Sequence, residues 1–377
     1  METNTKPIRV LHFYKTSFPY SFGGVEQVIH QLCQGGFEHG ISNEVLVLST
    51  NGKSETIDVS GYKVHSVKQN FQIASTGFSL SAFRRFKELS EQSDIIHYHF
   101  PWPFMDLVHV LMRIKKPVVV SYHSDIVRQK RLLTLYRPLK RYFFSKVDRI
   151  VAASPNYMAS SDVLMRYSDK ANVITYGLDK TSYQEPTLNT LARWKNITGE
   201  KFFLFLGVLR YYKGLHILLD ALAEVDYPVV IAGSGPVEQE LHTHAEKLNL
   251  KNVHFVGKVS EEDKVALLST CYGVVFPSHL RSEAFGISLL EGAMYGKPMI
   301  SSEIGTGTTY INIDRETGLV VPPSDPVALR KAMTYFWENE QEASAMGKNA
   351  ESRYWELFTS DKMVESYASL YRELHNK

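Results

Sequence analysis

The segment Phe202-Phe-Leu-Phe-Leu-Gly-Val-Leu-Arg-Tyr-Tyr-Lys-Gly-Leu-His-Ile-Leu-Leu-Asp-Ala-Leu222 shows most clearly the order of elements that indicates the fold. Its uninterrupted apolar run at 202–206 indicates a strand that is buried on both faces. A glycine turn follows, and the leucine-rich stretch that begins at Leu215 indicates a helix packed on that strand. Strand, turn and helix in this order are typical of a parallel α/β sheet.

The same alternation of apolar runs and amphipathic stretches continues on both sides of this segment. In the first half, the predicted strands are 8–14, 44–49, 63–67, 94–99, 117–123, 149–153 and 172–176. In the second half, they are 202–206, 229–232, 254–256, 273–276, 298–301 and 318–321. Helices are predicted between most of them, including 215–225, 238–248 and 263–270. The predicted fold class is therefore α/β, with two Rossmann-like, doubly wound domains.

The domain boundary is predicted near Tyr176-Gly177-Leu178-Asp179, ahead of a polar stretch at 180–200. We expect domains at 1–178 and 179–358, and a C-terminal helix at 359–377 that packs back on the first domain. Residues 1–178 hold 22 Lys and Arg against 14 Asp and Glu, a net charge of +8. The remainder holds 20 against 26, a net charge of −6. This asymmetry predicts an anionic partner for the first domain.

The sequence gives no sign of export or of a membrane span. The polar start lacks the basic segment and apolar core of a signal peptide, and no apolar run approaches the roughly 20 residues that cross a bilayer. Cys33 and Cys271 lie far apart and fit reduced core residues better than a disulfide or a metal site. We therefore expect a cytosolic protein.

Two acidic residues, Glu283 and Glu291, bracket the apolar sequence Ala-Phe-Gly-Ile-Ser-Leu-Leu at the expected start of a helix. A buried carboxylate is costly without a partner, and a ligand rich in hydroxyl groups can offset that cost. We expect Glu283 in the loop and Glu291 on the helix, too far apart to act as an acid–base pair. The amides of Phe285, Gly286 and Ile287 would point out of the helix start and suit an anion. The element predicts a nucleotide-sugar site.

Two cations, Arg210 and Lys213, follow the strand at 202–206 and are placed at the carboxyl edge of the predicted sheet. Ligands bind at this edge in open α/β folds, and an arginine fork beside a lysine point charge suits a diphosphate. A solvated charge pair is the alternative. In the first half, Gly23-Gly24 after the first strand would let the backbone approach a ligand, although a plain turn also fits.

His123 and Asp125 end another first-half strand and are also expected at the carboxyl edge. A ligand contact and an internal hydrogen-bonding role are both open for His123. His97 and His99 alternate along the neighbouring strand, but we find no third ligand at convincing spacing. We therefore predict that they line the core and bind no metal.

The stretch 126–147 is basic, aromatic and free of acidic residues. Such an amphipathic segment suits an anionic membrane surface or a lipid diphosphate, whereas the alternative is a solvated helix face. Nucleic acid would attract the same charges, but no nucleic-acid-binding module is visible, and we expect no nucleic acid partner. The candidate acceptor-side or membrane-side residues are Asp125, Arg128, Lys130, Arg131, Arg137, Lys140 and Arg141.

Together these elements resemble the retaining glycosyltransferases of family 4, which have the GT-B architecture: two Rossmann-like domains facing a cleft, with a C-terminal helix returning to the first. The resemblance covers nearly the whole chain. Its most specific part is the pair Glu283 and Glu291, and Arg210, Lys213, Gly23-Gly24, His123 and the linker follow in matching order. It implies an acceptor-side first domain and a nucleotide-sugar-binding second domain.

The resemblance also implies a role for each residue. Glu283 would hold the donor sugar and Glu291 the ribose. Arg210 and Lys213 would hold the diphosphate, near the Gly24 backbone. His123 would contact the sugar at its 6-hydroxyl, which makes Glu283, Arg210, Lys213 and His123 the catalytic set. The base would lie by the loop that contains Val259.

Closer similarity points to bacterial O-antigen mannosyltransferases, carried by the segments 305–312 and 317–323. It implies a GDP-mannose donor and an undecaprenyl-diphosphate-linked acceptor, with GlcNAc and an α-1,3 linkage expected. UDP-glucose, UDP-GlcNAc and GDP-rhamnose remain alternative donors. The expected location is the cytoplasmic face of the inner membrane, as a peripheral protein that contacts other O-antigen assembly enzymes.

The expected mechanism needs no cofactor. No Asp-x-Asp motif occurs and no side chain stands out as a nucleophile, so the leaving diphosphate itself would accept the acceptor's proton. Other classes fit parts of the pattern: an NAD-dependent oxidoreductase, a non-catalytic sugar-nucleotide or membrane-binding module, and a sugar-nucleotide epimerase. The first is opposed by Gly233-Ser-Gly235, which lacks the third glycine of the dinucleotide fingerprint.

Overall fold

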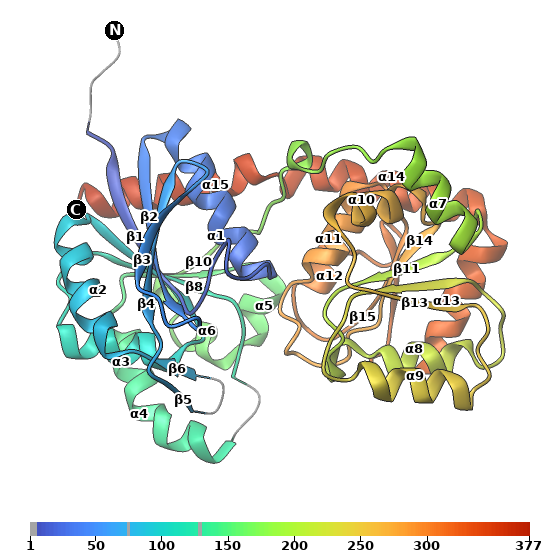
Figure 1. Ribbon diagram of the computed structural model, residues 1–377, viewed down its shortest axis with the longest axis horizontal. Coiled ribbons are helices and arrows are strands. Elements are labelled where there is room, and N and C mark those ends of the chain that lie inside the picture. The colour runs from blue at the N-terminus through green and yellow to red at the C-terminus, as the bar shows by residue number, and fades with distance from the viewer. Residues whose placement is uncertain (1–5, 74–75, 127–129) are drawn as a thin grey trace, which may run out of the picture. The chain divides into compact units, whose positions relative to one another are not determined.

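The computed structural model describes residues 6–73, 76–126 and 130–377, apart from the side chains at 130–132. It forms two compact units, one comprising Met1–Gly177 with Ser360–Lys377 and the other Leu178–Thr359 (Figure 1). These limits differ by one residue from the domain boundaries that the sequence predicts. The last helix, α15 (Ser360–His375), belongs to the first unit although the whole second unit precedes it in the chain.

The first unit is built on an eight-stranded sheet in the order β10-β9-β8-β7-β1-β2-β4-β3. All neighbours pair in parallel except β3 and β4. The strands are β1 (Ile8–Phe13), β2 (Ile41–Ser49), β3 (Glu55–Val59), β4 (Tyr62–Lys68), β7 (Ile95–Phe100), β8 (Val118–Tyr122), β9 (Arg149–Ala152) and β10 (Ala171–Val173). A separate hairpin joins β5 (Phe71–Ile73) and β6 (Thr76–Phe78).

The helices of this unit follow their strands in chain order. They are α1 (Gly24–Gly35), α2 (Leu80–Gln92), α3 (Pro103–Met112), α4 (Lys130–Lys146), α5 (Pro155–Ser160), α6 (Asp162–Arg166) and α15 (Ser360–His375), with 3-10 turns η1 (Gly36–His39) and η2 (Ser168–Lys170). Helix α15 packs beside α1, where a Cβ added at Gly35 would lie 2.8 Å from Val364. The absence of a side chain at Gly35 therefore allows the two helices to approach closely.

The second unit contains a six-stranded, fully parallel sheet in the order β13-β12-β11-β14-β15-β16. Its strands are β11 (Phe203–Leu206), β12 (Val229–Ala232), β13 (Val253–Gly257), β14 (Gly273–Phe276), β15 (Met299–Ser302) and β16 (Gly318–Val321). Its helices are α7 (Leu188–Thr198), α8 (Leu215–Leu222), α9 (Glu238–Lys247), α10 (Glu261–Thr270), α11 (Ile287–Met294), α12 (Thr308–Ile311), α13 (Pro326–Glu338) and α14 (Glu340–Leu357), with 3-10 turns η3 (Lys180–Ser182) and η4 (Tyr211–Lys213).

The strand order places a topological switch point between β11 and β14. The chain moves outward from β11 to β13, then returns to the other side of β11 and continues to β16. The carboxyl ends of β11 and β14 therefore mark the position at which ligands bind in open α/β folds. Backbone contacts fix the loops at this edge: a Cβ at Gly214 would lie 2.0 Å from the Pro277 carbonyl oxygen, and one at Gly233 would lie 1.9 Å from that of Gly207.

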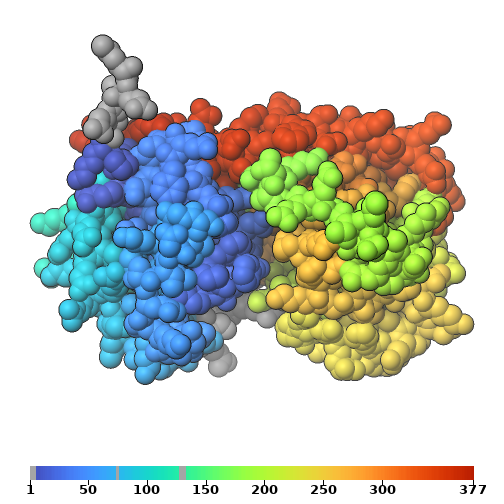
Figure 2. Space-filling model, turned by 45° about the horizontal axis from the view of Figure 1, so that its top comes forward, coloured from blue at the N-terminus to red at the C-terminus, as the bar shows by residue number. Residues whose placement is uncertain are grey.

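The α/β class and every predicted strand are confirmed, but β3, both strands of the β5–β6 hairpin and helix α7 were missed. Strand β3 and the hairpin strand β5 are mostly exposed, so they lack the apolar runs by which buried strands are recognised. Helix α7 lies inside the polar stretch 180–200 and on the surface of the second unit, in green in Figures 1 and 2. It packs on α10, and its Trp194 indole donates to Asp263 at 2.9 Å.

Cys33 and Cys271 are both free and buried, as predicted. In the part of the chain that the structure describes, no helix combines the length and the apolarity that crossing a bilayer requires.

Candidate functional site

An ion pair between Lys213 and Glu283 occupies the switch point of the second unit. Lys213 ends the turn after β11, and Glu283 lies in the loop after β14. The two side chains are each 11% exposed and are joined by a hydrogen bond from Nζ to Oε2. The ammonium also lies 4.6 Å from the centre of the Phe276 ring. Two groups from loops 70 residues apart in sequence are thus held together at the edge where ligands bind.

Glu291 lies on α11, separate from Glu283, as the sequence predicts. Its carboxylate is 7% exposed and pairs with Lys264 Nζ at 3.1 Å. The same oxygen accepts a hydrogen bond from the Tyr183 hydroxyl at 2.9 Å. The Lys264 ammonium also lies 4.7 Å from the Tyr183 ring centre. Glu291 is therefore satisfied by protein groups, and both of its partners were missed because neither belongs to a recognisable motif.

The start of α11 lies between the two glutamates. Gly286 caps the helix with a φ of 102°, a left-handed conformation that favours glycine, and no side chain caps the helix there. First-turn amides of a helix have no partner within the helix and attract anions. Phe285 is buried and Ile287 is the first helical residue. The amides predicted to bind an anion thus lie at a helix start that no side chain caps.

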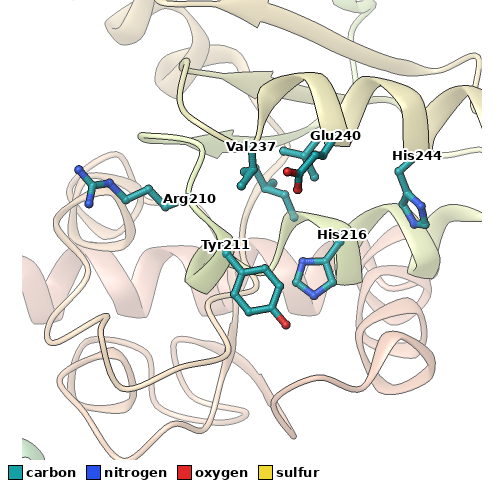
Figure 3. Close-up of a pocket in the computed structure, with 8 residues that line it drawn as sticks. Arg210, Tyr211, His216, Val237, Glu240 and His244 are labelled. Atoms are coloured by element: carbon teal, nitrogen blue, oxygen red, sulfur yellow. The ribbon is translucent and has the colours of Figure 1, made fainter. Parts of the chain in front are cut away.

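Arg210 borders a cavity of about 230 Å³ between the starts of α8 and α9 (Figure 3). The Arg210 side chain is exposed and is directed away from the Tyr211 and His216 rings, which stack at 5.0 Å. Within the described residues it has no ion-pair partner. The cavity is lined by Arg210, Tyr211, Leu215, His216, Val237, Glu240, Leu241 and His244. Lys213 and Glu283 do not line it, so the two predicted diphosphate ligands face different surroundings.

The remaining predicted donor-side residues lie at carboxyl strand ends. Val259 is half-buried after β13, whose last residue, Gly257, accepts from the Gly233 amide at 2.7 Å. Gly23 caps α1 and Gly24 begins it, both after β1. The φ of Gly23 is −109°, so its conformation does not require glycine. A Cβ there would instead meet the Glu26 carboxylate at 2.4 Å.

His123 follows β8 and ends a buried chain of three imidazoles in the first unit. Its Nε2 lies 2.9 Å from His99 Nδ1, and its Nδ1 is hydrogen-bonded to the Tyr176 hydroxyl. His99 Nε2 lies 3.0 Å from His12 Nδ1, and His12 Nε2 lies 3.1 Å from Asn43 Oδ1. Both ring nitrogens of His123 therefore have internal partners. His12, Asn43 and Tyr176 were missed because no local pattern marks them.

His97 lies beside this chain under α15. Its Nδ1 is 2.6 Å from the Tyr371 hydroxyl and its Nε2 is 2.8 Å from Ser121 Oγ, which also contacts the Tyr367 hydroxyl. His12, His97 and His99 offer nitrogens within 4.8 Å of one another, a set that could hold a metal. The third residue, His12, was not predicted from the sequence. Every ring nitrogen of the three already has a hydrogen-bond partner, so the hydrogen bonds account for the cluster, and a metal-free protein remains our prediction.

Asp125 is hydrogen-bonded to neighbouring groups of the first unit. Its Oδ1 accepts from the Tyr122 and Ser161 hydroxyls, both at 2.8 Å. Its amide donates to the Tyr157 hydroxyl. These contacts give Asp125 a structural role in holding the loop after β8, beside the acceptor-side role predicted for it.

The basic stretch forms helix α4, whose Phe143 and Phe144 are buried. Arg137 and Arg141 are exposed, whereas Lys140 is half-buried. Leu135 and Tyr142 are also exposed, at 80% and 52%. Arg128 lies outside the described residues, as do the side chains of Lys130 and Arg131. The described part of α4 is thus amphipathic, with basic, apolar and aromatic groups together on its exposed face.

Known proteins resemble the chain over nearly its whole length. Residues 22–182 match the family Glycosyltransferase Family 4, and residues 189–353 match Glycosyl transferases group 1. A D-rhamnosyltransferase, WbpZ, of Pseudomonas aeruginosa is 61% identical, over 94% of this chain and 93% of its own. O-antigen chain mannosyltransferase C of Escherichia coli is 50% identical, over 97% and 99%. A sucrose-phosphate synthase structure from Thermosynechococcus elongatus has a TM-score of 0.82 at 21% identity, covering 98% and 99%.

The fold and the switch-point site therefore define a two-domain glycosyltransferase with the GT-B fold. The chain belongs to glycosyltransferase family 4.

The imidazole cluster predicts that acid destabilises the first unit. Burial lowers the pKa of His12 to about 4 and of His123 to about 3, and holds those of His97 and His99 well below their usual value. Below about pH 6.5 the unfolded chain binds protons that the folded unit does not. The stability of the folded unit therefore decreases as the pH is lowered from about 6.5 to the folded-state pKa of each histidine. Each group contributes about 1.4 kcal/mol per pH unit within that window.

Hydrogen exchange of β1 and β7 amides, corrected for intrinsic rates, should show this loss between pH 7 and pH 5. The variant His12→Gln removes one titrating ring and should show a shallower dependence. Protection that stays constant over this range would contradict the assignment of neutral, buried imidazoles.

Proposed function

We propose that the protein transfers a mannosyl residue from GDP-mannose to an undecaprenyl-diphosphate-linked saccharide, with retention of configuration, in lipopolysaccharide O-antigen assembly. The expected acceptor sugar is GlcNAc, and the expected product is α-linked. The observation that carries the proposal is the buried Lys213–Glu283 pair beside the start of α11, at the switch point of the second unit. A cation, a carboxylate and a helix start suit a diphosphate joined to a polyhydroxylated sugar.

The relatives support the sugar class but differ in the donor that their names state. One is named a mannosyltransferase and the other a D-rhamnosyltransferase. D-rhamnose is 6-deoxymannose, so the two sugars differ only by the hydroxyl at C6. Because this chain is more similar in sequence to the rhamnosyltransferase than to the mannosyltransferase, GDP-D-rhamnose is a candidate donor beside GDP-mannose.

The proposed mechanism is electrostatic. As the bond from the sugar to the diphosphate breaks, negative charge develops on the leaving oxygen. Lys213, Arg210 and the start of α11 stabilise that charge, and the oxygen accepts the proton of the acceptor hydroxyl on the same face of the sugar. The diphosphate replaces Glu283 as the ion-pair partner of Lys213, and the Glu283 carboxylate then binds hydroxyls of the sugar. Glu291 holds the ribose, and His123 accepts a hydrogen bond from the 6-hydroxyl.

Incubation of the protein with GDP-mannose and a lipid-linked GlcNAc acceptor tests the reaction. We expect an α-linked mannosyl product, analysed by NMR of the released disaccharide, and no requirement for a divalent ion. Parallel reactions with UDP-glucose and UDP-GlcNAc should give no product. A β-linked product, or transfer from a UDP-sugar in preference to GDP-mannose, would contradict the proposal.

The variants Glu283→Gln and Lys213→Met test the pair. Each removes a charged group that contacts the donor, so kcat should fall by roughly 10²- to 10³-fold. Breaking a buried pair also destabilises a protein, by about 3–5 kcal/mol, so the folded fraction must be measured alongside.

The matched control for this pair is Glu340→Gln. Glu340 pairs with Lys201 in the same unit, but its side chain is 65% exposed and lies away from the switch point. Its loss should leave kcat unchanged. Full activity in either Glu283→Gln or Lys213→Met would refute the assigned roles.

We also propose that helix α4 holds the protein on the cytoplasmic face of the inner membrane. Support comes from its exposed Arg137, Arg141 and Lys146 beside Leu135 and Tyr142. Basic groups attract anionic lipid at about 1 kcal/mol each, and the apolar side chains can enter the interface.

Sedimentation with vesicles that contain about 30% anionic lipid, at about physiological salt, tests this surface. The triple variant Arg137→Glu, Arg141→Glu, Lys146→Glu should bind at least about 100-fold more weakly. The control Arg84→Glu, Lys87→Glu, Lys115→Glu makes the same charge change on other exposed residues of the first unit. Equal losses in both variants would show that net charge, rather than α4, drives binding.

A further inference from the structure

The imidazole chain that ends at His123 has a defined direction. The Asn43 side-chain amide donates from Nδ2 to the Leu32 carbonyl oxygen at 3.1 Å, and a carbonyl can only accept. The Asn43 oxygen therefore faces His12 and accepts from its Nε2–H. A Cβ at Gly36 would lie 2.3 Å from Asn43 Nδ2, so the amide fits because residue 36 is glycine.

Each ring in turn fixes the next. A neutral imidazole has one donor and one acceptor nitrogen, so His12 must accept at Nδ1 from the Nε2–H of His99. His99 then accepts at Nδ1 from the Nε2–H of His123. His123 is left with a bare Nδ1, which only a donor can satisfy. In the structure that donor is the Tyr176 hydroxyl.

This arrangement bears on how the enzyme treats a sugar without a 6-hydroxyl. All the groups involved are buried, with exposures of 0% for His12 and His99, 3% for Asn43, 5% for His123 and 6% for Tyr176. A site built to bind a substrate hydroxyl rejects the analogue that lacks it, because the protein group is left without a partner. Here Tyr176 supplies a hydroxyl of the protein's own to the same nitrogen.

We infer that Tyr176 is a specificity-determining residue, which lets the enzyme use both a mannosyl donor and its 6-deoxy counterpart. The inference rests on the proposed function, in which the 6-hydroxyl of the donor sugar binds at His123. A 6-hydroxyl takes the place of the Tyr176 hydroxyl at Nδ1, whereas a 6-deoxy sugar leaves the tyrosine in place. Asn43, His12 and His99 are positioning residues that keep Nδ1 an acceptor in both cases.

The test compares kcat/KM for GDP-mannose and GDP-D-rhamnose in the wild type and in Tyr176→Phe. The wild-type ratio should lie within about 100-fold, far below the 10⁴- to 10⁵-fold of a site that demands the hydroxyl. In Tyr176→Phe a 6-deoxy sugar leaves Nδ1 without a donor, so the ratio should shift toward GDP-mannose by at least about tenfold. A wild-type ratio above 10⁴, or a ratio that Tyr176→Phe leaves unchanged, would overturn the inference.

The control variant is Tyr371→Phe. It also removes a buried hydroxyl that contacts an imidazole, but that imidazole is His97, outside the chain to His123. The donor ratio should not change in this variant. An equal shift in both variants would overturn the inference, because loss of a buried hydroxyl would then act through packing alone.

A nitrogen-15 spectrum of the histidine side chains provides a reading that needs no turnover. In the wild type, His123 should carry its proton on Nε2, and a proton on Nδ1 would overturn the inference. If neither donor is turned over, the proposed function fails. The protonation state of His123 then still decides whether the positioning chain exists.

Discussion

The ion pair between Lys213 and Glu283 is the interaction on which the site depends. It exists because the chain crosses from one side of β11 to the other, so that loops 70 residues apart meet at the carboxyl ends of β11 and β14. Neither charge is stable there alone, since each is almost removed from water. Their pairing keeps the ligand-free site folded and places a cation and a carboxylate beside the start of α11. In the proposed mechanism, a donor diphosphate pairs with Lys213 and leaves Glu283 available for the sugar.

A comparable constraint operates in the first unit, where the sheet buries imidazoles beside apolar side chains. His97 and Ser121 meet the hydroxyls of Tyr371 and Tyr367, so α15 docks through hydrogen bonds in addition to apolar packing. Buried polar groups are stable only when each is satisfied, and here every imidazole is. His97 also packs against the rings of His12 and His99. The hydrogen bonds that hold α15 are therefore adjacent to the hydrogen-bonded chain that ends at His123.

The sequence predicted what depends on local pattern and missed what depends on tertiary contact. Apolar runs identify strands such as β11 and β14 because both faces are buried, whereas the exposed β3 carries no such signal. Glu283 was singled out because a carboxylate in an apolar run is costly to bury, and Lys213 because it follows a strand and a glycine turn. Tyr183 and Lys264, the partners of Glu291, lie 108 and 27 residues from it and share no motif. Strand pairing places His12 opposite His97 and within hydrogen-bonding distance of His99, and a single sequence does not reveal that pairing.

The central claim is that the donor diphosphate replaces Glu283 as the partner of Lys213. A crystal structure of the protein with GDP-mannose tests it most directly. We predict that the diphosphate lies within hydrogen-bonding distance of Lys213 Nζ and the first-turn amides of α11, with the Glu283 carboxylate turned to sugar hydroxyls. A complex in which the Lys213–Glu283 pair remains intact while the diphosphate binds elsewhere would contradict the account.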